Sequence, residues 1–146
     1  MVTIMVKALK KKARGLATVE MAIVLPLLLL VTMGAIRYGH LFLIAQEVTN
    51  ATRNGARRAI VPDATNADVE GIVRELMSAA GLDEGDYTLT LPGDVHSIPM
   101  GQSVTVQITV PVANVDVLHV PLFTNLEPNN GNWILGATVT MAKEGF

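Results

Sequence analysis

One long apolar segment dominates the pattern of hydrophobic and polar positions in this chain of 146 residues. From Leu16 to Ile36 the chain is apolar or small throughout, apart from three polar residues, Thr18, Glu20 and Thr32. A segment of this length suits a membrane span, because about 20 predominantly apolar residues cross a hydrocarbon core roughly 30 Å thick. The pattern therefore predicts a transmembrane segment over residues 16–36.

Five basic residues and no acidic residue precede this segment within residues 1–15, namely Lys7, Lys10, Lys11, Lys12 and Arg14. A basic flank holds its end of a span in the cytoplasm and directs the rest of the chain outward. We therefore expect a single-pass membrane protein with a cytoplasmic N-terminus and a C-terminal part outside the cytoplasm.

Glu20 is the unexpected residue, because it places a carboxylate inside the apolar run. A charge costs up to roughly 3.5 kcal/mol at the centre of a span, whereas each Leu, Ile, Val or Phe returns roughly 0.3–0.6 kcal/mol. The eleven such residues of the segment together return roughly 5 kcal/mol, so the segment should still insert. The segment can therefore insert despite Glu20, but insertion gives no reason for a glutamate at this position.

The helix should continue beyond the span, because Leu41, Ile44, Val48, Thr52, Gly55 and Ala59 follow helical spacing and no proline lies between Pro26 and Pro62. We expect one helix from about Leu16 to Val61, with residues 37–61 outside the membrane. Small residues at its far end indicate close approach by another element of the same chain, most simply by its sheet.

Residues 62–146 predict a small α+β domain with a second helix and a three- or four-stranded antiparallel sheet. Thr65 and Asp68 form a capping-box pattern at the start of a helix over about Asn66 to Ala80, and Gly81 suits its C-terminal cap. Three segments alternate between apolar and polar residues, as half-buried strands do: 87–91, 104–110 and 137–141. The long connection of residues 111–135 contains a turn pattern at Asn130-Gly131.

Charge is distributed unevenly, although the formal net charge is only −2. After Arg58 the chain has two basic residues, Arg74 and Lys143, against eleven acidic ones. Such an acidic domain argues against binding to nucleic acid or to an anionic membrane surface. The chain has no cysteine, so packing alone must stabilise the domain.

Few residues in the sequence form a pattern typical of a catalytic or ligand-binding site. We expect neither an enzyme nor a metal or cofactor site. The run Asp94-x-His96-Ser97 contains residue types of a catalytic triad, but neighbours in sequence do not form triad geometry and an exposed loop explains them better. The three histidines, His40, His96 and His119, lack the spacing of metal ligands. The acidic run from Asp83 to Asp86 suits a solvated turn, with weak calcium binding left open.

The N-terminal residues closely resemble the type IV pilin superfamily, and most of all the TadE-like family of minor pilins and pseudopilins of the tight-adherence (Tad, Flp) pilus. The resemblance is carried by Arg14-Gly15, by the run from Val19-Glu20 to Leu25-Pro26, and by the downstream run from Asn50 to Arg57. It is specific over residues 14–61 and looser beyond. The size of the domain after residue 61 favours a minor subunit over a major pilin.

The resemblance implies that residues 1–15 form a leader, which a prepilin peptidase removes by cutting between Gly15 and Leu16. Glu20 then becomes the fifth residue of the mature chain, where its carboxylate can pair with the Leu16 amine of a neighbouring subunit. Pro26 also lies where pilin helices commonly carry a proline. The implied partners are the peptidase, other pilin or pseudopilin subunits and an inner-membrane assembly platform.

Two alternatives stay open at this point. In the first, the apolar segment serves only as an uncleaved signal anchor for an extracytoplasmic binding domain, and Glu20 is incidental. Three arginines of the outer helix, Arg53, Arg57 and Arg58, can pair with acidic residues of the domain or of a neighbouring subunit, or can form a solvated face.

Overall fold

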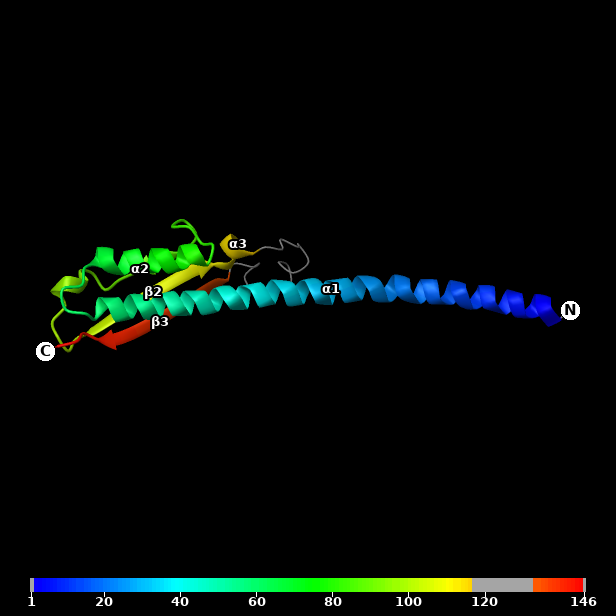
Figure 1. The fold of residues 1–146 in the computed structure, drawn as a ribbon, viewed down its shortest axis with the longest axis horizontal. Helices are drawn as coiled ribbons and strands as arrows, with labels where there is room; N and C mark the ends of the chain where they lie inside the picture. Colours follow the sequence, from blue (N-terminus) through cyan, green and yellow to red (C-terminus); the bar gives the residue numbers. More distant parts are fainter. Residues whose placement is uncertain (1, 117–132, 146) are drawn as a thin grey trace. The chain divides into compact units, whose positions relative to one another are not determined.

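The computed structural model describes residues 2–116 and 133–145, with side chains from residue 17 onward (Figure 1). The protein has the predicted α+β architecture, with one long helix, a second helix and a three-stranded antiparallel sheet. In chain order the elements are α1 (Val2–Ala59), α2 (Asn66–Ala79), β1 (Thr88–Thr90), the 3-10 turn η1 (Val95–Ser97), β2 (Ser103–Pro111), α3 (Val112–Val115) and β3 (Ile134–Ala142).

Helix α1 starts earlier than the sequence predicted, at Val2 rather than near Leu16, and it ends at Ala59. The residues before Gly15 are mostly good helix formers such as Met, Ala, Leu and Lys, so the basic segment extends the helix. Pro26 lies inside α1 without ending it. Contacts divide the chain into two units, Met1–Ile36 and Arg37–Phe146, called here the first and second units.

Helix α2 begins with the predicted capping box. The backbone N–H of Asp68 donates to Thr65 Oγ1 at 3.3 Å, and the Thr65 N–H donates to Asp68 Oδ2 at 2.9 Å. The helix ends one residue before the predicted end, and Gly81 follows with φ +80°, a left-handed conformation that favours glycine. The backbone N–H of Leu82 donates to the Met77 carbonyl at 2.9 Å, and the N–H of Gly81 donates to the Ser78 carbonyl at 2.9 Å. These two bonds make the end of the helix a Schellman motif.

The sheet has the order β1-β2-β3, with both pairs antiparallel. The central strand β2 aligns with β3 over nine residue pairs, among them Thr105 opposite Thr140, whose hydroxyl oxygens lie 2.8 Å apart. The first strand is shorter than residues 87–91, and the other two are longer than predicted. The turn pattern at Asn130-Gly131 and His119 lie outside the described residues.

The core of the second unit lies between the two helices and β2. Alternate β2 residues are fully buried, whereas the inward residues of β3 are only half-buried. The end of α1 contributes the predicted stripe of small residues, with Thr52 and Ala59 at 0% exposure. Helix α2 lies beside this part of α1 (Figure 1) and contributes Val69, Val73 and Met77, all fully buried.

Gly55 marks the closest approach between these elements. A Cβ atom added there would lie 2.9 Å from Val73 Cγ2 of α2 and 3.6 Å from Val106 Cγ1 of β2. The sequence predicted contact with the strands, and the structure shows that the tighter neighbour is the second helix. A side chain at this position therefore forces Val73 or the helices themselves to shift.

Replacing Gly55 by leucine should therefore destabilise the second unit by an overpacking cost of about 1–3 kcal/mol. The full chain in detergent micelles can be unfolded with urea while the fluorescence of its one tryptophan, Trp133, is followed. Gly71→Leu is the matched control, since Gly71 lies in α2 with nothing within 4 Å of its added Cβ. The control should gain a little stability from helix propensity. Equal behaviour of the two variants would contradict the close packing at Gly55.

Candidate functional site

The first unit presents its apolar side chains on all sides of α1. Large apolar residues from Val19 to Ile36 are between 40% and 71% exposed within the isolated chain. Within the described residues, this helix is the one that is long and apolar enough to cross a membrane, by length and composition. An apolar surface on every side of a helix needs lipid or other apolar helices around it.

Four of the predicted site residues lie in this part of α1. Gly15 and Leu16 belong to this helix, and the Leu16 side chain is not among those described. Glu20 is exposed, and within the described chain its carboxylate has no ion-pair partner. Pro26 lies among the exposed apolar residues of the same helix.

The three arginines at the end of α1 have different surroundings. Arg58 Nη2 lies 3.2 Å from Asp68 Oδ2, with both side chains about a third exposed. Hydrogen bonds from Thr65 lower the pKa of Asp68 below its usual value, and the bond from Arg58 lowers it further. Arg53 and Arg57 are exposed and form no ion pair with the described residues. The structure therefore brings one arginine to an acidic partner and leaves two on the surface.

A buried ion pair that the sequence analysis did not predict lies at the start of the second unit. Arg37 Nε donates to Asp116 Oδ1 at 3.0 Å, and Arg37 Nη2 lies 2.9 Å from Asp116 Oδ2. The two side chains are 2% and 6% exposed, and two parallel contacts make the pair bidentate. Leu41 and Ile44 belong to a buried stripe of α1, and Arg37 lies one helical turn before Leu41 on the same stripe. The helical spacing could therefore have predicted the burial of Arg37.

Lys143 is a second buried cation that the sequence analysis missed. Its Nζ donates to the carbonyl oxygens of Val95 at 2.6 Å and His96 at 3.2 Å, and the residue is 6% exposed. The inward residues of β3 have odd numbers, so the alternation continued past Met141 places Lys143 on the inner side. Its two hydrogen bonds fasten the end of the chain to η1.

The residues considered for catalysis form a local turn. The Asp94 side chain accepts the backbone N–H of His96 at 3.1 Å, and Ser97 Oγ donates to the Asp94 carbonyl at 2.8 Å. These contacts cap η1. In the acidic run, Asp86 Oδ2 accepts the backbone N–H of Asp83 at 2.9 Å, which closes a turn. Among the described residues, no group of His, Cys, Asp and Glu side chains could hold a metal ion.

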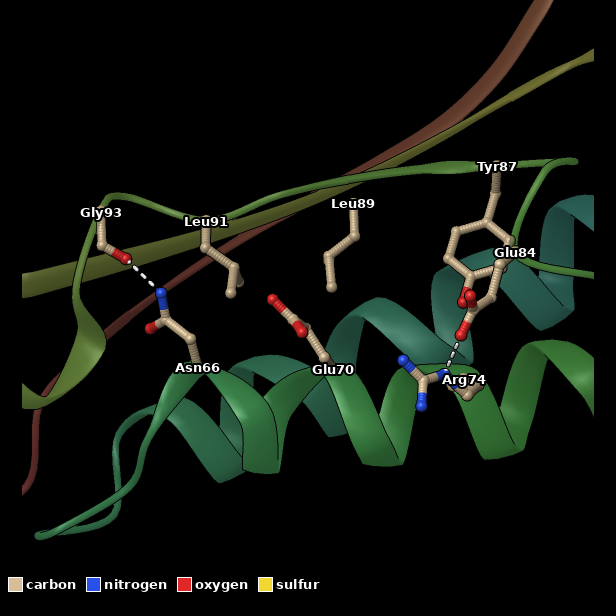
Figure 2. Close-up of a pocket in the computed structure, with 8 residues that line it drawn as sticks. All are labelled: Asn66, Glu70, Arg74, Glu84, Tyr87, Leu89, Leu91 and Gly93. Atoms are coloured by element: carbon tan, nitrogen blue, oxygen red, sulfur yellow. Dashed lines mark hydrogen bonds and ion pairs between the residues drawn. The ribbon is translucent and has the colours of Figure 1, made fainter.

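A groove of about 510 Å³ lies between α2 and the segment that contains β1 (Figure 2). One side consists of residues four apart on one face of α2, namely Asn66, Glu70 and Arg74. The other side consists of alternate residues of the extended segment, namely Tyr87, Leu89 and Leu91. Figure 2 shows the two sets of side chains facing each other. The groove therefore has a half-buried apolar side and a polar side.

Polar contacts cross the groove near both of its ends. Asn66 Nδ2 donates to the Gly93 carbonyl at 2.8 Å at one end, and Arg74 forms an ion pair with Glu84 at the other (Figure 2). Desolvation raises the pKa of Tyr87, and the negative charge of Glu84 raises it further. The sequence analysis did not predict this groove, because it depends on how α2 and β1 are packed.

Comparison with protein-family models gives one match, over residues 15–57, to the model described as TadE-like protein. This match confirms the resemblance inferred from Gly15, Glu20 and the downstream run ending at Arg57. Comparison with curated proteins and with solved structures gives no significant match. The match thus covers part of α1 and none of α2 or the sheet.

Proposed function

We propose that this protein is a minor pilin or pseudopilin that takes part in the assembly of a Tad-type type IV pilus used for surface attachment. The observation that carries the proposal is the TadE-like match, which begins at Gly15 and continues through the apolar part of α1. That part of the helix is apolar on every side. A helix that leaves the lipid to join a bundle of similar helices needs such a surface.

In this proposal a prepilin peptidase removes residues 1–15, and the cut creates a charged amine on Leu16. Within an assembly of parallel helices, Glu20 pairs with the Leu16 amine of a neighbouring subunit. A subunit in the wrong register would leave both charges buried and unpaired, which is strongly unfavourable. The carboxylate therefore acts as a register device. Its exposure in the single chain leaves it accessible to such a partner.

The proposed location follows from the same features. The basic residues before Gly15 keep the N-terminus in the cytoplasm, residues 16–36 cross the inner membrane, and the second unit lies in the periplasm or outside the cell. The partners are the peptidase, other pilin or pseudopilin subunits and the inner-membrane assembly platform. Arg53 and Arg57 offer two surface cations for contact with those subunits.

Processing tests this proposal against an uncleaved membrane anchor. In cells with a matching prepilin peptidase, the chain should begin at Leu16, and Gly15→Leu should stop the cut because a large residue does not fit before the scissile bond. Mass spectrometry of the membrane fraction measures the N-terminus directly. Gly39→Leu is the matched control, since Gly39 also lies in α1 with nothing within 4 Å of its added Cβ. Recovery of only the full-length chain from these cells would favour the anchor.

A further inference from the structure

Strand β1 is an edge of the sheet formed by the described residues. The strand order is β1-β2-β3, and among these residues β1 pairs with β2 alone. Within the described part of the chain, the backbone bonds of Thr88–Thr90 run to β2 alone. An edge strand presents unpaired N–H and C=O groups that can bind another extended chain.

The groove beside this edge has the length of a short extended segment. From Asn66 to Arg74 the polar side of the groove spans eight residue steps along α2, or about 12 Å at a rise of 1.5 Å per residue. An extended chain rises about 3.3 Å per residue, so about four residues fit between the two cross-groove contacts. Leu89 and Leu91 are half-buried and offer an apolar surface to alternate side chains of such a segment.

The charge of the groove indicates which residue a partner should carry. Arg74 is paired with Glu84, whereas Glu70, between the two ends, has no ion pair or hydrogen bond with the described residues. Figure 2 shows its carboxylate pointing across the groove, between Leu89 and Leu91. The groove thus carries one uncompensated negative charge, in a domain where acidic residues greatly outnumber basic ones. A lysine or arginine on the partner would neutralise it.

We propose that the groove between α2 and β1 binds an extended segment of another protein, which adds to the edge of β1 opposite β2 as a fourth strand. Apolar side chains of the segment pack on Leu89 and Leu91, and a basic side chain pairs with Glu70. Main-chain bonds then give affinity and alternate side chains give specificity, as in other cases of strand addition. The proposal does not depend on the pilus role, because it rests on the second unit alone.

A labelled peptide tests the proposal with the full chain in detergent micelles. The probe is an acetylated heptapeptide, Thr-Val-Thr-Lys-Thr-Val-Thr, whose valines and lysine share one face when the peptide is extended. Fluorescence anisotropy should show saturable binding at submillimolar peptide. The same peptide with N-methyl groups on alternate amides cannot form the main-chain bonds and should not bind. Amides of Thr88–Thr90 should exchange more slowly with deuterium when the unmodified peptide is bound.

Variants of the helix test the charge. Glu70→Gln should weaken binding of the lysine peptide about two- to fivefold, as expected for an exposed ion pair. Glu70→Lys should reverse the preference in favour of a peptide with glutamate in place of lysine. Glu75→Lys is the matched control, because this exposed residue of α2 does not line the groove and the variant should retain the original preference.

Three results would overturn the proposal. The first is no binding at millimolar peptide, and the second is equal binding of the N-methylated peptide, which would indicate a site for side chains alone. The third is self-association of the full chain that Glu70→Lys abolishes, which would assign the groove to a second copy. None of these results bears on cleavage at Gly15, so the two proposals fail separately.

Discussion

Replacing Asp116 by asparagine is expected to lower the free energy of unfolding of the second unit by about 3–5 kcal/mol, because it removes the negative charge that lies against the buried Arg37 guanidinium. Both side chains of the pair are almost fully buried, at 2% and 6% exposure, so water cannot replace the missing carboxylate. Urea unfolding of the full chain in detergent micelles, followed by Trp133 fluorescence, measures the change.

Two further variants separate the buried charge from other effects. Arg58→Gln removes one partner of an ion pair whose side chains are 35% and 38% exposed, and it should have a far smaller effect. The double variant Arg37→Met with Asp116→Leu removes both buried charges and should recover most of the stability that Asp116→Asn loses. A loss for Asp116→Asn no larger than that for Arg58→Gln would contradict the burial of the pair.

The elements that the sequence predicted well are those set by local patterns. The capping box of Thr65 and Asp68 involves residues three apart, and Gly81 ends the same helix through a conformation that glycine favours. The strands follow from alternation, and the small-residue stripe around Gly55 from helical spacing. In each case a few neighbouring residues contain the information.

The features that the sequence analysis missed depend on residues far apart in the chain. Arg37 and Asp116 are 79 positions apart, and spacing along the chain does not pair them. Lys143 donates to the backbone carbonyl groups of Val95 and His96, and no pattern in the sequence identifies these two carbonyls as acceptors. The groove beside Glu70 exists only because α2 and β1 pack together. The apolar segment and its glutamate, by contrast, could be recognised without any tertiary contact.

Replacing Glu20 by leucine is expected to abolish pilus formation while leaving insertion and cleavage intact. In a simple anchor the change removes an insertion penalty of up to about 3 kcal/mol and should leave function unchanged or slightly improved. In an assembling subunit it leaves the Leu16 amine of a neighbour without a partner in an apolar contact. Breaking such a buried pair costs about 3–5 kcal/mol, so the two hypotheses predict effects of opposite sign.

Thr32→Leu provides the matched control for this experiment. It also replaces a polar residue of the span by leucine, but the Thr32 hydroxyl donates to the Leu28 carbonyl of its own helix at 2.8 Å, so it needs no partner from a neighbour. Thr32→Leu should leave the number of fibres and surface adherence unchanged, whereas Glu20→Leu should eliminate both with normal protein in the membrane. Equal fibre counts for the two variants would show that Glu20 has no part in assembly, and the chain would then be better described as a membrane-tethered domain.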